Sequence, residues 1–190
     1  MAVKILTSRL LLRRFTQTDL PALPEMFADT AVQEYLAIGL MGPKGARAFA
    51  ETFIRASDDE WREGGCGVMA MVPRGGGDGA PDDPPNAPLV GYCGLRHLPD
   101  RISAVEVVYA LRQDRWGQGL ATEAARAVLD WGFETLPVRE ILAFTRPPHA
   151  ASRRVMEKAG MEFQGETDRY YGEILAVYGL SRPGNPMASR

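Results

Sequence analysis

The chain of 190 residues is poor in the residue types that build metal sites and disulfide frameworks. It has two cysteines, Cys66 and Cys93, and two histidines, His97 and His149. No Cys-x-x-Cys pair and no Cys/His cluster occurs, so a zinc site lacks suitable ligands. We therefore expect no metal and two buried or half-buried thiols in a reducing cytoplasm. Nothing in the sequence requires a disulfide, and nothing rules one out.

An excess of one charge is also missing, because 22 Lys and Arg face 24 Asp and Glu, for a net charge of −2. The chain thus lacks the basic excess of a general nucleic-acid binder, although its net charge does not exclude a local basic patch. No apolar run approaches the roughly 18 residues of a membrane span. The charged stretch up to Arg14 has no secretory core. These absences predict a cytoplasmic protein with no nucleic-acid partner and no membrane partner.

Length and composition predict a single globular domain, since 45% of the residues are hydrophobic and 24% are charged. No internal repeat is present. Residues 73–88 are dense in Gly, Pro and Asp without periodicity, and they separate two strand-like runs. We interpret them as a mobile loop inside a hairpin. Residues 183–190 have a similar composition, so the predicted domain is 1–182 with a disordered tail.

The order of apolar patterns predicts a mixed α/β fold. Strand-like runs occur at 9–14, 67–72, 89–97, 103–111, 140–145, 161–166 and 174–180. Helical spacing occurs at 21–28, 45–62, 119–134 and 150–159. Hairpins come first and strand–helix–strand crossovers follow, which predicts a mixed sheet with helices on both faces. Glu123 falls on the polar side of the helix at 119–134.

The segment from Val107 to Ala124 joins an apolar strand to a helix through a turn that contains Gly117 and Gly119. Glycines let successive N–H groups turn to one side, and the start of a helix favours a phosphate. The turn is therefore a candidate anion cradle, and tight strand-to-helix packing without a ligand is the alternative. The P-loop motif Gly-x-x-x-x-Gly-Lys-Ser/Thr is absent. Thr122 stands where a dinucleotide fingerprint needs its third glycine.

The stretch Trp116–Ala124 (WGQGLATEA) resembles motif A of the GCN5-related N-acetyltransferases, the GNAT family. Thr7–Arg13 (TSRLLLR) is similar to the first strand of the Rim-type branch, which acetylates ribosomal-protein N-termini. Val105–Tyr109 resembles the strand before motif A, and Ala151–Met161 resembles motif B. The likeness covers nearly the whole chain. It implies a seven-stranded, mostly antiparallel mixed sheet that splays in the middle.

The resemblance implies transfer of an acetyl group from acetyl-CoA to a primary amine in a ternary complex, with the pyrophosphate on the amides of motif A. It places the pantetheine arm beside the strand that ends at Leu111. His149 stands where the branch usually has an Asn that holds this arm, and Trp116 stands where the broad family has Gln or Arg. Arg153, Arg154 and Lys158 lie near the expected adenosine end, with a solvated basic face as the alternative. The expected cofactor-binding residues are Tyr109, Ala110, Leu111, Trp116, Gly117, Gln118, Gly119, Leu120, Ala121, Thr122, His149, Ser152, Arg153 and Lys158.

The candidate catalytic residues are Glu106, Ser152 and Tyr170. Glu106 stands in an otherwise apolar strand, where burial raises the pKa of a carboxyl group towards the range of a useful base; a solvent-facing residue is the alternative. Ser152 is the expected proton donor by its position in motif B, and a helix cap or a cofactor contact is the alternative. Tyr170 or Tyr171 is a rival donor, with a core or rim role as the alternative. A strand amide near Tyr109 or Ala110 is expected to polarise the thioester carbonyl.

The sequence does not name the acceptor. In this fold, segments such as 27–54 and 167–172 are expected to shape the acceptor site. Residues 35–43 are mostly apolar and lack an acidic cluster, which favours an amine with an apolar portion or a peptide N-terminus. An acyltransferase with a different donor and a catalytically silent CoA-binding module stay as alternatives. The lack of a cysteine near the cradle argues against an acetyl-enzyme, and a homodimer rests only on analogy with the fold.

Overall fold

A computed structural model describes residues 3–36, 40–75, 87–99 and 101–182 of the chain. Most of the predicted loop at 73–88 lies outside the described residues, as does the predicted tail at 183–190. The strands on either side of that loop are direct neighbours in the sheet and run antiparallel. These two flanking strands therefore pair as the arms of a hairpin do.

The sheet has eight strands in the order β1-β2-β3-β4-β5-β6-β8-β7. Their bounds are Lys4–Leu6 (β1), Leu10–Arg13 (β2), Val68–Pro73 (β3), Gly91–Leu98 (β4), Arg101–Leu111 (β5), Glu140–Thr145 (β6), Glu162–Thr167 (β7) and Leu175–Ser181 (β8). Neighbours run antiparallel except β5 and β6, which are parallel. The predicted mixed, mostly antiparallel sheet is thus confirmed, but the predicted number of seven strands was wrong. The additional strand, β1, is three residues long, too short to show an alternating pattern.

The helices are Ala22–Ala28 (α1), Thr30–Gln33 (α2), Pro43–Gly64 (α3), Leu120–Thr135 (α4) and Ala150–Lys158 (α5). Four of them lie where helical spacing predicted them. Helix α2 was missed because it is a single turn. This helix begins at a side-chain cap and shows no apolar periodicity: the Asp29 side chain accepts a hydrogen bond from the N–H of Ala31 at 2.9 Å.

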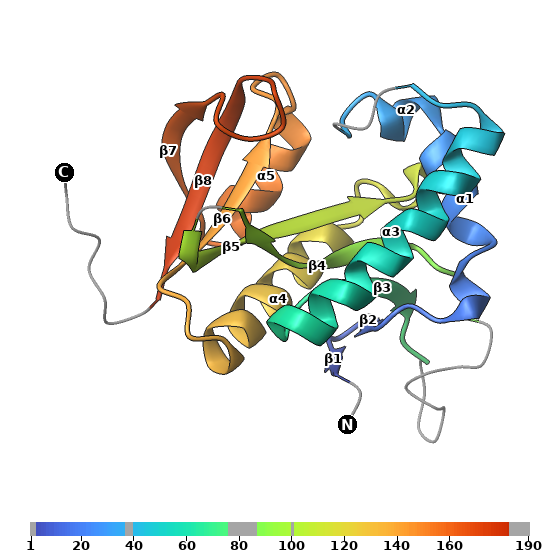
Figure 1. The fold of residues 1–190 in the computed structure, drawn as a ribbon, viewed down its shortest axis with the longest axis horizontal. Helices are drawn as coiled ribbons and strands as arrows, with labels where there is room; N and C mark the ends of the chain where they lie inside the picture. Colours follow the sequence, from blue (N-terminus) through green and yellow to red (C-terminus); the bar gives the residue numbers. More distant parts are fainter. Residues whose placement is uncertain (1–2, 37–39, 76–86, 100, 183–190) are drawn as a thin grey trace.

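Helices cover both faces of the sheet, as predicted (Figure 1). Helices α1 and α3 pack on one face, against residues such as Ala70, Tyr92 and Val108. Helix α4 packs on the other face, against residues such as Leu95 and Val107, and α5 lies beside α4. Successive side chains of β5 therefore alternate between the two helical layers.

Strands β5 and β6 part in the middle of the sheet, as the resemblance implied. They pair only where Ala104–Glu106 face Glu140–Leu142, although β5 continues to Leu111. The N–H of Arg112 bonds to Val90, which precedes β4, at 3.0 Å. Because alternate residues direct their backbone groups to opposite strand edges, the N–H groups of Val107, Tyr109 and Leu111 face the gap on the β6 side. Figure 1 shows β5 crossing the molecule, with β6, β7 and β8 gathered on one side of this gap.

Candidate active site

A cavity of about 670 Å³ opens where β5 and β6 part. Its walls are of two kinds, which we name by the nearest long helix. The α4 half comprises the turn Gly117–Thr122 with the start of α5. The α3 half comprises Phe49, Phe53, Tyr92, Arg96, Glu106 and Tyr171. Residues Tyr109, Ala110 and Leu111 of β5 line the cavity between them.

Free backbone N–H groups form the floor of the α4 half. Within the described residues, no N–H from Gly117 to Thr122 has a hydrogen-bond partner, whereas the N–H of Trp116 bonds to Gln113 and that of Glu123 bonds to Gly119. The turn takes this shape because Gly117 and Gly119 adopt φ angles of 72° and 77°, which favour glycine. The first turn of a helix leaves its N–H groups unpaired and carries partial positive charge. The turn is therefore not closed by its own hydrogen bonds, and its N–H groups can bind an anion.

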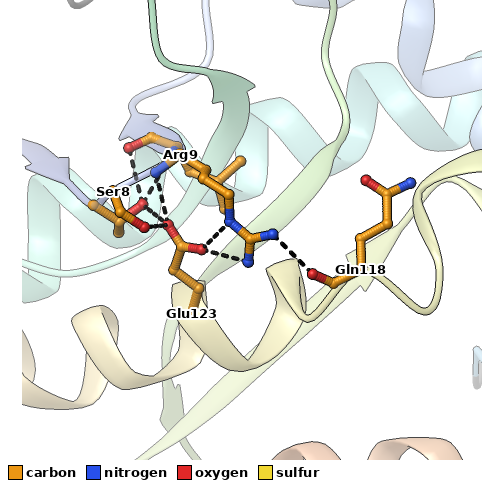
Figure 2. Close-up of polar contacts among 6 residues, drawn as sticks. Ser8, Arg9, Gln118 and Glu123 are labelled. Atoms are coloured by element: carbon orange, nitrogen blue, oxygen red, sulfur yellow. Dashed lines mark hydrogen bonds and ion pairs between the residues drawn. The ribbon is translucent and has the colours of Figure 1, made fainter. Parts of the chain in front are cut away.

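A polar clamp holds this cradle from behind (Figure 2). The carboxylate of Glu123 accepts hydrogen bonds from Thr7 Oγ1 at 2.5 Å, from Ser8 Oγ at 2.9 Å, and from Arg9 N at 2.8 Å and Nε at 2.7 Å. Arg9 Nη1 also donates to the carbonyl of Gln118 at 2.9 Å. Burial works against ionisation, but these hydrogen bonds lower the pKa of Glu123 to about 2. The expectation that Glu123 is simply a polar-face residue was therefore incomplete.

A pair of hydroxyls lies where α5 begins. Tyr109 Oη donates to the carbonyl of Ser152 at 3.1 Å and lies 2.9 Å from Ser152 Oγ, where either oxygen can donate. Both residues line the cavity, and Ser152 is 8% exposed. Burial raises the pKa of the Tyr109 phenol well above its usual range, so it stays protonated. The two hydroxyls can therefore pass a proton between them.

His149 lines the cavity at the N-cap of α5. Its Nδ1 lies 3.2 Å from Thr145 Oγ1, and its ring stacks on Tyr35 with centroids 3.8 Å apart. Burial lowers the pKa of His149, which keeps the ring neutral at physiological pH. The ring is held by this stacking and by the contact of Nδ1 with Thr145, which leaves Nε2 to form one hydrogen bond to a ligand.

The predicted basic side chains of α5 point in two different directions. Arg154 and Lys158 line the cavity. Arg153 points elsewhere, because its Nε donates to Tyr178 Oη at 3.0 Å and its guanidinium lies over the Phe163 ring. Gln118 also turns away, since its side chain donates to the carbonyl of Asp114 at 3.2 Å. Of the predicted cofactor set, Arg153 and Gln118 thus present no side chain to the cavity.

Glu106 is the buried carboxylate of the α3 half, 4% exposed. Burial raises the pKa of Glu106 to about 7, although a hydrogen bond from Tyr171 and the charge of Arg96 act to lower it. The Tyr171 hydroxyl donates to Oε2, while Oε1 has no partner among the described residues. Tyr171, and not Tyr170, therefore meets the candidate base. The Tyr170 ring packs on Phe144 instead, at 5.0 Å.

Aromatic rings and an ion pair complete the α3 half. The rings of Phe53 and Tyr92 lie 4.8 Å apart on the cavity wall. Arg146, at the end of β6, donates from Nε to Glu173 at 2.8 Å and from Nη1 to the carbonyl of Glu34 at 2.6 Å. This side chain therefore joins the end of α2 to the segment before β8. Phe49 and Tyr171, from the expected acceptor segments 27–54 and 167–172, both line the cavity.

Comparison with known proteins identifies the family. The model of the acetyltransferase (GNAT) domain matches residues 9–162. The chain belongs to the GNAT family. Uncharacterized protein YkkB of Bacillus subtilis (strain 168) is 30% identical, over 92% of this chain and 94% of its own length. The fold resembles a GNAT-family acetyltransferase from Bacillus anthracis, with a TM-score of 0.74 at 24% identity over 95% and 99% of the two chains. It also resembles the ribosomal L7/L12 acetyltransferase RimL in complex with CoA, with a TM-score of 0.76 at 14% identity over 96% and 100%.

This GNAT protein is accordingly an N-acetyltransferase, and its family uses acetyl-CoA. Within the described part of the chain, no group of three or more His, Cys, Asp or Glu residues could hold a metal ion. Cys66 and Cys93 are both free and buried, and burial raises the pKa of each thiol. None of the described helices combines the length and apolar character that a membrane span requires.

Sequence reasoning did not find Arg96, Arg146 or Glu173 of this GNAT acetyltransferase. Each is a single charged residue outside any motif, so only its neighbours in space show that it belongs to the cavity. The one usable signal was alternation along β4, where Tyr92, Gly94 and Arg96 share a face. Alternation alone does not place Arg96 beside Glu106, because that also requires the register between β4 and β5.

Proposed function

We propose that this acetyltransferase holds acetyl-CoA in the α4 half of the cavity and a primary amine in the α3 half, and that the amine attacks the thioester directly. One observation carries the proposal: the unpartnered N–H groups from Gly117 to Thr122 border the cavity where β5 and β6 part. A row of N–H groups at a helix start fits a pyrophosphate. Arg154 and Lys158 add positive charge to the same wall. The residues present therefore fit the donor.

The open edge of β5 supports the position of the pantetheine arm. An extended chain with amide groups can bond to a strand edge as a further strand would. The N–H groups of Tyr109 and Leu111 face the gap, whereas that of Ala110 faces β4. Of the two amides expected to polarise the thioester carbonyl, we therefore assign the role to the N–H of Tyr109. The carbonyl of Leu111 already accepts a hydrogen bond from Trp116 Nε1 at 2.9 Å.

Proton movement is assigned to residues on the two sides of β5. Glu106, whose pKa is raised to about 7 by burial, takes a proton from the incoming ammonium, directly or through water. Ser152 gives a proton to the departing thiolate, and the Tyr109 hydroxyl 2.9 Å away can replace it. A thiol with an ordinary pKa of about 8.5 leaves readily as thiolate. The contribution of Ser152 is therefore smaller than that of Glu106.

The donor site is tested by thermal unfolding with acetyl-CoA. Acetyl-CoA is expected to raise the melting temperature, and Gly119→Glu to remove the rise because it places a carboxylate at the cradle. Gly165→Glu is the matched control, since Gly165 also has a positive φ (123°) but lies in open space on β7 at the sheet edge. The control should keep the rise. No rise in the unmodified protein would overturn the donor site.

Catalysis is tested separately by release of free CoA thiol with a panel of amines, amino acids and peptides. Thiol release is expected only when an amine is present, because direct attack forms no acetyl-enzyme. Release that does not depend on the amine would contradict direct transfer. Binding of acetyl-CoA without release for any acceptor would favour a CoA-binding module instead.

A further inference from the structure

The α3 half of the cavity presents two opposite charges on adjacent strands. Arg96 on β4 is the direct register partner of Glu106 on β5, and both residues line the cavity. Directly opposed residues of an antiparallel pair lie about 5.5 Å apart at Cα and point to the same face. Among the ion pairs of the described residues, none joins these two; Arg96 instead meets Glu60, with Nε 3.4 Å from Oε1. The two charged groups are therefore neighbours that do not neutralise each other directly.

The Arg96 guanidinium keeps most of its hydrogen-bonding capacity. It has five N–H donors, and within the described residues its Nε finds no hydrogen-bond acceptor. Its ion-pair partner among the described residues is Glu60, and burial raises the pKa of that carboxyl group above its usual value although the charge of Arg96 acts to lower it. Stacking on Phe53, with Cζ 5.5 Å from the ring centroid, keeps the group at the wall. Arg146, another cation that lines the cavity, already donates to the Glu173 carboxylate and to the backbone carbonyl of Glu34.

This geometry fits an acceptor whose amine and anionic group are close together. Glu106 Oε1 is open to receive the amine, and Arg96 stands one strand away. The amine and carboxylate of an α-amino acid are joined through a single carbon, so one molecule can reach both groups. Phe49, Phe53 and Tyr92 form an apolar wall beside them. Aromatic walls favour an apolar side chain by burial and by ring contacts.

We propose that the acceptor is a free α-amino acid with an apolar side chain, its carboxylate on Arg96 and its amine towards Glu106. This rests on the proposed function, because it assigns the α3 half to the acceptor. A polyamine would place a second positive charge against Arg96. A peptide N-terminus lacks the adjacent carboxylate, so it would leave the buried Arg96 Nε without a hydrogen-bond acceptor, which is costly.

Paired acceptors test the assignment. kcat/KM is measured at pH 8 with saturating acetyl-CoA for L-phenylalanine against L-phenylalaninamide, and for L-leucine against L-leucinamide. The free acid is expected to be preferred at least about tenfold, the usual worth of a charge-assisted hydrogen bond. The amide has the less basic amine, so more of it is neutral at this pH. A preference for the acid would therefore run against the effect of amine protonation.

Variants of Arg96 show whether this preference comes from the guanidinium. The acid-to-amide ratio is expected to fall towards 1 in Arg96→Gln and to be partly kept in Arg96→Lys, which retains the charge. Arg62→Gln is the control, because Arg62 lies on the exposed side of α3, where it pairs with Asp59. It should leave the ratio unchanged.

Three results would overturn the assignment: equal use of acid and amide, an unchanged ratio in Arg96→Gln, or a better kcat/KM for Phe-Gly-Gly than for phenylalanine. The acetyl-CoA melting shift is measured on the same samples to separate this failure from that of the proposed function. A shift with no acetylation of either amino acid means that the amino-acid assignment is wrong while the donor site stands. With no shift, the proposed function fails and the assignment fails with it.

Discussion

The two halves of the cavity are built from different materials. The α4 half is made of backbone N–H groups from Gly117 to Thr122, fixed by a helix start and by the clamp around Glu123. The α3 half is made of side chains whose properties depend on burial and on partners from other strands, such as Glu106 with Tyr171. Backbone donors do not titrate, but Glu106 does. We therefore expect donor binding to be insensitive to pH and turnover to depend on it.

Glu106→Gln tests this contrast with the largest expected effect. Removing a general base costs about 10²- to 10³-fold in kcat/KM. In the unmodified protein, activity should rise as the pH passes about 7, where Glu106 ionises. The variant should lack that rise, while its melting shift with acetyl-CoA stays. Full activity between pH 6 and 9 would exclude Glu106 as the base.

Stability provides the control for this variant. The pKa of Glu106 is raised in the folded state by burial, from 4.5 to about 7. Between these values the folded state binds more protons than the unfolded state, so stability falls as the pH rises from 4.5 to 7. Glutamine does not ionise and avoids this loss. Glu106→Gln should therefore unfold at the same or a higher temperature than the unmodified protein at pH 8; a lower temperature would indicate damage to the fold.

Ser152→Ala should have a smaller effect, about 10- to 100-fold on kcat, because a thiolate leaves without much acid assistance. The KM for acetyl-CoA should change little. Tyr109→Phe removes only the second hydroxyl of the pair and should reduce kcat less than Ser152→Ala. A rise in KM with unchanged kcat in Ser152→Ala would instead make this residue a cofactor contact or a helix cap.

Arg9→Ala should have the smallest effect and act on the donor side alone. Loss of the bonds to Glu123 and to the Gln118 carbonyl loosens the cradle, so the KM for acetyl-CoA should rise about 3- to 10-fold. Neither kcat nor the KM for the amine should change. Arg47→Ala is the control, since Arg47 pairs with Glu51 on the exposed surface of α3. An equal effect on both substrates would mean a general loss of structure.

The sequence predicted those features of the structure that depend on a local pattern of residues. Glycine spacing placed the cradle, and alternation placed Glu106 in an apolar strand, because both depend on a few consecutive residues. The shape of the α3 half could not be predicted, since it depends on the register between β4 and β5 and on where the loop before β8 folds. For this reason the sequence could not choose between Tyr170 and Tyr171: the structure brings the Tyr171 hydroxyl to Glu106, from a residue with a φ of 64°. The role of Glu123 likewise needed the contact with a turn more than 100 residues away in sequence.

The gap beside β5 also has a mechanical consequence. Within the described residues, β5 pairs with β6 at three positions, from Ala104 to Glu106, and not beyond them, so the β6–β8–β7 part of the sheet is joined to the rest over this short ladder. A donor that forms hydrogen bonds with the N–H groups of Tyr109 and Leu111 would occupy the place of the missing strand pairing and make the sheet continuous. Amide hydrogens of these two residues should then exchange with solvent much more slowly when acetyl-CoA is bound, and the two parts of the sheet should move as one body.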